Sequence, residues 1–278
     1  MSASLTAVQQ IAFDELVKIE YQSQGFLLRD AVRLKRDVIG AQVSFRKVGQ
    51  VMSVPTAYLS TVVIQDPNYE QVSCNLQKYT TPTAVDTVQE LTVNFDSKME
   101  NAMLIGMGMG RRSDQIIINA LAADPSQTIV DGGTNFDYPK FTQVYEYFED
   151  NAVPKGERFV AMSASNLRAL MSDDQFVSTF YTQNRILDKG YILEYLGINV
   201  VIIPKMLEGG LPKTGNIRKA FAWHKMAVGA AIGQDFRTEV NYLPKETSWL
   251  VNGIFSMGSV VIDDTGVFEI NCDESVNT

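Results

Sequence analysis

The stretch from Asp96 to Leu121 limits what this chain can fold into more than any other part of it. It contains no proline and has few β-branched residues before Ile116. Its apolar or small residues recur every three or four positions, as one face of a long helix requires: Met99, Ala102, Met103, Gly106, Met109 or Gly110, Ser113 or Asp114, Ile117 and Leu121. Asp96 and Ser97 offer an N-cap. The pattern predicts a spine helix over about 96–121, roughly 40 Å long.

Three glycines interrupt this predicted helix, in the sequence GMGMGRR at Gly106, Gly108 and Gly110. A dinucleotide-binding loop needs GxGxxG directly after a strand, whereas GxGxG lies here inside a helical pattern. Each glycine weakens a helix by roughly 1 kcal/mol relative to alanine. We therefore interpret the glycines as positions where another backbone packs closely or where the helix bends.

The composition is that of a globular chain, large enough for one large domain or two smaller ones. Of its 278 residues, 45% are hydrophobic and 20% are charged, which argues against a disordered chain. The 24 Lys and Arg residues against 32 Asp and Glu residues give a net charge of −8. No overall positive field therefore draws the chain to nucleic acid or to an anionic membrane, and any DNA contact must be local.

Neither a membrane span nor a secretion signal is visible in the sequence. The longest apolar runs, such as GINVVIIP at 197–204, are too short to cross a bilayer, and the N-terminal residues lack a basic start and an apolar core. We expect synthesis in a cytoplasm and no contact with membranes. Cys74 and Cys272 show no CxxC spacing, so we expect buried reduced thiols and no disulfide.

The N-terminal region indicates a helical arm followed by a basic link. The apolar residues of the arm step by three or four positions, from Leu5 through Val8, Ala12 and Leu16 to Ile19, and a stop signal follows at Gly25. The link RDAVRLKR carries four basic residues: Arg29, Arg33, Lys35 and Arg36. They could contact phosphate or an acidic neighbour, but we favour a solvated or intersubunit charged face.

Residues 42 to 82 show the period of two that is typical of strands. Polar and apolar residues alternate in QVSFRKVG and EQVSCNLQKY, and YLSTVVI at 58–64 is rich in β-branched residues. A turn at 66–69, DPNY, separates two of the runs. The region predicts a long, half-polar hairpin. Because a hairpin alone buries too little to be stable in water, we expect it to project and to pack on another molecule.

A second unit is predicted after the glycine-containing loop at 123–136. Its expected elements are a helix at 138–151 with Pro139 in the first turn, a strand at 158–162, a short helix capped by Ser163, a buried strand at 197–204 and an apolar helix at 223–233. The C-terminal part returns to strands at 236–242, 249–262 and 267–270, with a turn at 263–266. The expected fold class is α+β, with strands at both ends of the chain around helices.

No constellation of residues in the sequence points to catalysis, to a cofactor or to a metal. His224 is the only histidine, which excludes a two-histidine zinc site, and without a GxSxG elbow it is better read as a packed residue beside Trp223. In GGLPKTG a proline precedes Lys213, so the segment is not a P-loop. It also matches the LPxTG sorting pattern, but 63 residues follow that motif in the chain, so it is a surface turn. Asp263-Asp264 lacks the spacing of a calcium loop.

Taken in order, these elements resemble the major capsid proteins of tailed bacteriophages with the HK97 fold. The resemblance covers nearly the whole chain and is most specific in two parts. One is the end of the spine, with Arg112, Asp114, Gln115 and the run from Ile116 to Leu121. The other is the block from His224 to Ile270. The resemblance implies an N-terminal arm at 1–37, an E-loop hairpin at 38–82, a discontinuous P-domain at 83–136 and 234–278, and an A-domain at 137–233.

The resemblance also implies the function and the partners of the chain. A family member assembles as pentamers and hexamers into an icosahedral shell, first a procapsid, that encloses double-stranded DNA contacted without sequence specificity. We see no long charged N-terminal extension, so we expect a separate scaffolding protein, besides a portal, and the sequence leaves open whether decoration proteins bind. The expected location is the virion, after assembly in the host cytoplasm. No lysine, Lys78 included, is assigned to covalent cross-linking.

Two other interpretations remain open, an encapsulin-like compartment and a small-molecule-binding module. The second leaves the arm and the hairpin unexplained, because both need surfaces that the chain itself does not provide. We expect these surfaces to contact other copies of the chain. The candidate intersubunit contacts are Arg29, Arg33, Lys35, Arg36, Phe45, Arg46 and Lys47.

Overall fold

Helix α2, Ser97–Ala123, is the longest helix of the computed structural model, which describes residues 25–62, 64–86, 97–173 and 194–276. The spine helix expected from the sequence is therefore present. Its buried face carries Ile105, Met109, Ile117 and Leu121. Met103, which we expected on that face, is 48% exposed, and Ile105 takes its place in the core at 2%.

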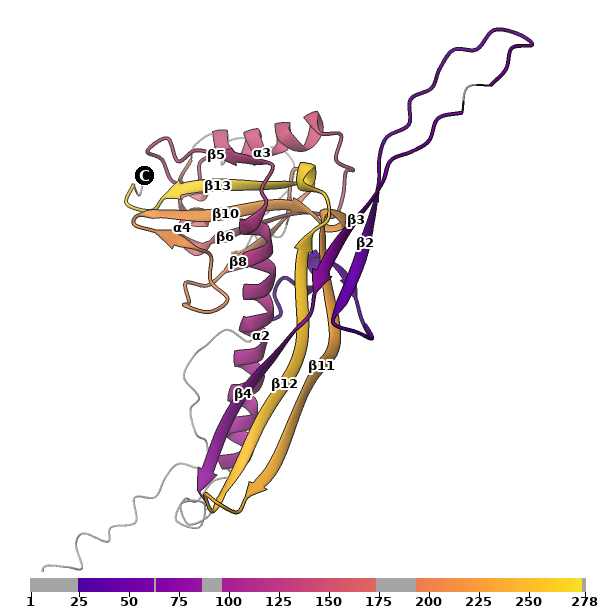
Figure 1. Cartoon of the computed structure of the whole chain (residues 1–278). Coiled ribbons are helices and arrows are strands. Elements are labelled where there is room, and N and C mark those ends of the chain that lie inside the picture. The colour runs from indigo at the N-terminus through magenta and orange to yellow at the C-terminus, as the bar shows by residue number, and fades with distance from the viewer. Residues whose placement is uncertain (1–24, 63, 87–96, 174–193, 277–278) are drawn as a thin grey trace, which may run out of the picture.

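A long four-stranded sheet lies beside the first half of α2, as Figure 1 shows. Its strands are, in spatial order, β1 (Arg33–Lys35), β11 (Val228–Leu243), β12 (Ser248–Val261) and β4 (Gln77–Asp86). The helix comes so close to β12 that a Cβ at Gly253 would lie 2.4 Å from both Ile105 and Met109. This contact explains why the long run of strand residues contains a glycine.

The second half of α2 packs under a seven-stranded sheet. The strands are, in spatial order, β5 (Gln127–Ile129), β13 (Val267–Asp273), β10 (Ile217–His224), β6 (Arg158–Ser163), β8 (Ile198–Ile203) and β7 (Glu194–Tyr195), with β9 (Lys213–Thr214) paired to β10. Strand β10 contributes side chains to two hydrophobic cores, one on each face of the sheet. Its residues Phe221 and Trp223 belong to the core that contains α2, whereas Ala220 and Ala222 belong to the core of α3.

Helices α3 (Tyr138–Asp150) and α4 (Ala164–Ser172) complete this second unit, and α3 lies across the sheet in Figure 1. Both begin as the sequence predicts. Asp137 caps α3, with Pro139 in the first turn, and the Ser163 hydroxyl accepts the N–H of Asn166 to cap α4. Phe141, Phe148 and other apolar side chains of α3 are fully buried.

Strands β2 (Gln42–Val48) and β3 (Tyr69–Asn75) form a separate two-stranded ribbon that projects from the body in Figure 1. The hairpin predicted over residues 42 to 82 is too long. It ends at Asn75, because β4 leaves β3 and pairs with β12 over ten residues. The expected strand over YLSTVVI is also wrong. No strand is assigned in the described part of 49–68, and that stretch forms the open end of the hairpin.

The predicted apolar helix at 223–233 is wrong as well. The structure has the end of β10, a short 3-10 turn η2 (Lys225–Ala227) and the beginning of β11. Apolar residues follow one another there without a break, which a central strand buried on both faces shares with a buried helix. The 3-10 turns η1 (Arg29–Ala31) and η3 (Asp264–Gly266) complete the elements. The predicted helix of residues 5–19 lies outside the described residues.

Candidate assembly surfaces

The hairpin root, the end of β2 and β3 that contacts the body, packs on glycines of the long sheet. The Phe45 ring is 3% exposed, and a Cβ at Gly229 would lie 2.8 Å from it. Beside it, a Cβ at Gly258 would lie 2.1 Å from the carbonyl oxygen of Asn75. Only glycine permits such close approach. The contacts therefore fix the place where the hairpin leaves the body.

An ion pair fastens the same root to the turn before β13. The ammonium of Lys47 lies 3.0 Å from Asp263 and 3.6 Å from Asp264. The hydrogen bond to Asp263 raises the pKa of Lys47 above its ordinary value. The sequence suggested Lys47 as an intersubunit contact, but in the structure its partners belong to its own chain.

Arg29 is likewise paired within the chain, because its guanidinium lies 2.9 Å from Asp235. Three other predicted contacts come together: Arg33 and Lys35 on β1 and Arg46 on β2 line one pocket, together with Phe45. The Arg33 guanidinium lies 5.8 Å from the centre of the Phe45 ring. Arg36 is exposed and does not line this pocket.

The open end of the hairpin carries a cluster of exposed apolar side chains that sequence reasoning missed. We call residues 49–68 the hairpin tip. Its large exposed side chains are Val51, Met52, Val54, Tyr58, Leu59, Val62 and Ile64. Tyr58 and Leu59 are as exposed as in an extended chain, at 103% and 108%. The lack of alternation in YLSTVVI, between Pro55 and Asp66, was the available signal against a half-buried strand.

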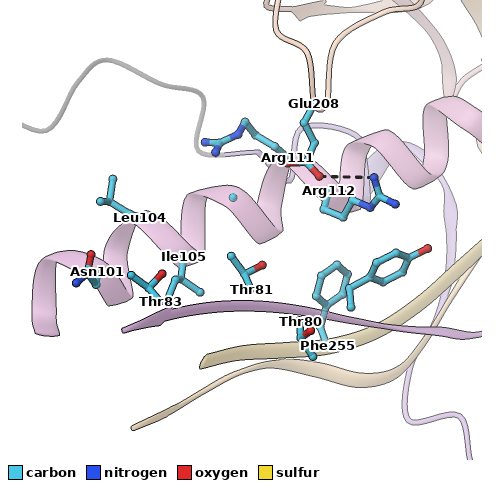
Figure 2. A pocket seen from close by; sticks show the side chains of 12 residues that line it. Thr80, Thr81, Thr83, Asn101, Leu104, Ile105, Arg111, Arg112, Glu208 and Phe255 are labelled. Carbon is cyan, nitrogen blue, oxygen red and sulfur yellow. Dashed lines mark ion pairs between the residues drawn. The ribbon is translucent and has the colours of Figure 1, made fainter. Parts of the chain in front are cut away.

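A groove of about 530 Å³ runs along α2 on the side that faces β4 and β12. Figure 2 shows Leu104 and Ile105 on the helix above Thr81, Thr83 and Phe255 on the strands. Arg112 closes one end. Its guanidinium lies 4.9 Å from the centre of the Tyr79 ring and 3.6 Å from a Glu208 oxygen. We call this the spine groove. It combines apolar walls with threonine hydroxyls, and Leu104 is 39% exposed.

The first described residues are anchored to α2 by a buried carboxylate. Asp114, which is 2% exposed, accepts the backbone N–H groups of Leu27 and Leu28, each at 3.1 Å. Burial raises the pKa of Asp114 to about 6, although the two hydrogen bonds oppose the shift. The indole N–H of Trp223 donates to the Ala31 carbonyl at 2.8 Å. The sequence pattern placed Asp114 on the apolar face of the predicted helix but did not indicate that it anchors the N-terminal segment.

The chemistry expected of an enzyme has no visible support in the described residues. No group of three His, Cys, Asp or Glu side chains there is placed to hold a metal. His224 is 7% exposed, and its Nδ1 accepts the N–H of Met226. Cys74 and Cys272 are buried free thiols. Among these same residues, no helix is long and apolar enough to span a membrane.

Comparisons with known proteins agree with this geometry. The family model described as phage capsid protein matches residues 5–274. Over 95% of this chain and 96% of the other, the structure is similar to that of Mycobacterium phage Che8, with a TM-score of 0.71 at 17% identity. The head structure of Helicobacter pylori bacteriophage KHP40 covers 95% of this chain and 96% of its own, with a TM-score of 0.79 at 11% identity.

The acid-stable capsid of Helicobacter pylori bacteriophage KHP30 covers 98% of this chain and 97% of its own, with a TM-score of 0.76 at 11% identity. No curated protein matches the sequence. The predicted α+β fold and the resemblance to tailed-phage capsid proteins are confirmed.

Proposed function

Because this chain belongs to the phage capsid protein family and forms a capsid shell, we propose that the hairpin tip of each subunit lies in the spine groove of a neighbour. We further propose that the subunits form pentamers and hexamers of an icosahedral shell around double-stranded DNA. The exposed hairpin tip is the observation that carries this proposal.

The tip needs a partner for a physical reason. Contiguous exposed apolar surface is costly in water and marks interaction sites in soluble proteins, and the tip has only one charged residue, Asp66, to offset it. Burial of its apolar side chains on another subunit would contribute roughly 1.5 kcal/mol or more for each fully buried one. The apolar character of the tip favours an apolar acceptor rather than an acidic surface.

The spine groove has the character of such an acceptor. Its apolar walls are Leu104, Ile105, Tyr79 and Phe255, and its threonine hydroxyls can bond to the backbone of an extended segment. Tip and groove lie on different surfaces of one subunit, so the contact between them is heterologous. A heterologous contact that closes on rotation makes a ring, and rings of five and six close a shell.

We propose the domain division that the resemblance implies: arm 1–37, E-loop 38–82, P-domain 83–136 and 234–278, and A-domain 137–233, with the hairpin part of the E-loop ending at Asn75 and Gln77 onward contributing to the long sheet. The long sheet and α2 support the P-domain, and the helices α3 and α4 with their strands support the A-domain. Strand β13 lies in the seven-stranded sheet, so the C-terminal segment contributes to both units.

A separate scaffolding protein, a portal and decoration proteins are the further partners that we propose, with assembly in the host cytoplasm before DNA enters. The role that we propose for the chain is structural and not enzymatic. Its contact with DNA is non-specific in this proposal, as the family resemblance implies, and it is local, because the net charge of −8 gives no general attraction to phosphate.

Polar substitution of the tip tests the proposal. A variant with Met52→Ser, Tyr58→Ser, Leu59→Ser and Ile64→Ser should unfold at the same denaturant concentration as the wild type, since these side chains are exposed in the single subunit. It should fail to form shells with the scaffolding protein, as seen by negative-stain microscopy and light scattering. Deletion of residues 50–70 with a short turn should act in the same way. Normal, equally heat-stable heads from either variant would show that the hairpin is not what joins the subunits.

A further inference from the structure

A pocket of about 540 Å³ beside the hairpin root gathers three cationic side chains. Arg33 and Lys35 stand on β1, and Arg46 stands on β2. Arg33 and Lys35 are two residues apart on one strand, so their side chains leave the same face about 7 Å apart. The remaining polar lining comes from Ser44 and Gln71. We call this the basic pocket.

The three cations have no anionic partner among the residues that the structure describes. No described carboxylate lines the pocket, and the residue opposite Arg46 in the β2–β3 ladder is Gln71. The neighbouring basic residues are different, because Arg29 is paired with Asp235 and Lys47 with Asp263. In a chain with eight more acidic than basic residues, three unpaired cations in one concavity are unexpected. Their mutual repulsion is relieved when an anion enters.

The arginines of the pocket and the net charge of −8 favour a carboxylate of another subunit over a phosphate of duplex DNA. All three cations are exposed, so the pocket is an open hollow that a side chain of a neighbouring subunit can reach. A guanidinium fork binds a carboxylate through two parallel hydrogen bonds, and the pocket has two arginines. In a shell of identical acidic subunits, the surplus carboxylates belong to the neighbouring copies.

We propose that the basic pocket binds one or two carboxylate side chains of a second copy of this chain. The proposal rests on the shell-forming function, and it is independent of where the hairpin tip lies. This contact is a second interface between subunits, besides that of the hairpin tip with the spine groove. Unlike the apolar tip contact, it weakens with added salt, since ion pairs that water can reach are screened.

Zero-length cross-linking with a carbodiimide tests the proposal directly, because it joins an amine only to a carboxylate already in contact with it. In assembled shells, Lys35 should be joined to an Asp or Glu peptide of another chain, and in dissociated subunits it should not. The pair of Lys47 and Asp263, 3.0 Å apart within one chain, is the positive control in both samples. If Lys47 is joined to Asp263 and Lys35 stays unmodified in shells, the proposal is wrong.

Charge reversal provides the second arm of the test. Arg33→Glu with Arg46→Glu should lower the yield of empty shells by about tenfold or more. The matched control, Lys78→Glu with Lys245→Glu, changes the net charge equally at two exposed residues outside the pocket and should assemble normally. Normal empty shells from the pocket variant that retain less DNA would assign the pocket to nucleic acid and overturn the proposal. If the wild type forms no shells, the proposed function is wrong. If the wild type and the pocket variant form shells in equal yield, only the proposal for the basic pocket is wrong.

Discussion

Gly258 on β12 lies directly under the backbone carbonyl of Asn75, so that a Cβ at position 258 would approach its oxygen to 2.1 Å. Substitution with alanine must therefore push the end of β3 away from the sheet. We expect Gly258→Ala to lower the free energy of unfolding by roughly 1–3 kcal/mol and to reduce shell formation more than this loss alone explains. The measurements are chemical unfolding of the subunit and counts of shells by electron microscopy.

A matched control for this variant is Gly106→Ala, because a Cβ there would lie at an ordinary 3.8 Å from Phe236. Alanine in place of a helical glycine should stabilise the subunit by up to about 1 kcal/mol and leave assembly intact. Equal assembly by the Gly258 and Gly106 variants would mean that the direction of the hairpin is not set at Gly258.

Gly108 lines the spine groove, and among the described residues a Cβ there would meet the Arg111 side chain alone, at 3.6 Å. Among the residues that the structure describes, no other backbone packs against Gly106 or Gly108, whereas the backbone of Gly25 does approach Gly110: a Cβ at Gly25 would lie 2.0 Å from the Gly110 carbonyl carbon. We expect Gly108→Leu to fold normally and to block assembly, because its side chain would fill the groove. Gly108→Ala should assemble. Shells of normal yield from the leucine variant, in a light-scattering assay, would rule out docking at this part of the groove.

Lys140 of α3 is 6% exposed, and the three N–H donors of its ammonium are shared among four backbone carbonyls within hydrogen-bond distance: those of Asp131, Thr134, Asn135 and Asn271, at 2.8 to 3.1 Å. Lys140→Met keeps most of the apolar stem but leaves these carbonyls without their donor. We expect a loss of roughly 2–3 kcal/mol in the free energy of unfolding. Lys155→Met, at a 76% exposed side chain, should cost less than about 1 kcal/mol, and an equal loss in both would contradict a role for the carbonyl contacts.

Glu274 gives the subunit an acid-sensitive contact. Burial alone would raise the pKa of this carboxyl, but hydrogen bonds from Arg218, Lys213 and Lys205 outweigh it and lower the pKa to about 2. Because the folded pKa is below the unfolded one, the stabilisation is complete above the ordinary value of 4.5 and is lost as the pH falls from 4.5 towards 2. With allowance for solvent screening, it is on the order of 1–2 kcal/mol.

Chemical unfolding measured between pH 5 and about pH 2.5 checks this prediction. Glu274→Gln should already be destabilised at pH 5 and should lose less stability than the wild type on acidification. Glu246→Gln, at an exposed residue of the β11–β12 turn, should keep the wild-type pH dependence. A Glu274 variant with the full wild-type acid response would show that other carboxyls dominate.

The parts of the fold that sequence reasoning predicted are those with a clear period and a local cap. Helix α3 begins at Tyr138 with Pro139 in its first turn, and α4 follows the Ser163 cap, because these signals act within a few residues. The segment at 223–233 was assigned wrongly, since an apolar run without alternation does not distinguish a central strand from a buried helix. The extent of the hairpin was predicted wrongly because it depends on pairing between strands far apart in the sequence: β4 pairs with β12 and not within the hairpin.

The candidate surfaces were only partly visible in the sequence. The basic residues were found by their type, but their separation into paired residues, such as Arg29 and Lys47, and pocket residues, such as Arg33 and Arg46, depends on tertiary contacts. Asp114 has no local pattern that marks it as the anchor of residues 27 and 28, which are more than 80 positions away in sequence.

Strand β10 carries alanines towards one core and the rings of Phe221 and Trp223 towards the other. Close-packed interiors transmit displacement rather than absorb it, so the sheet and α2 must move as one block. A shell built of rings of five and rings of six places identical chains in unequal surroundings. The block has little freedom to adjust to this difference. In the proposed shell the adjustment would fall to the hairpin tip, whose large apolar side chains are exposed in the single subunit, so that one rigid subunit could serve both kinds of ring.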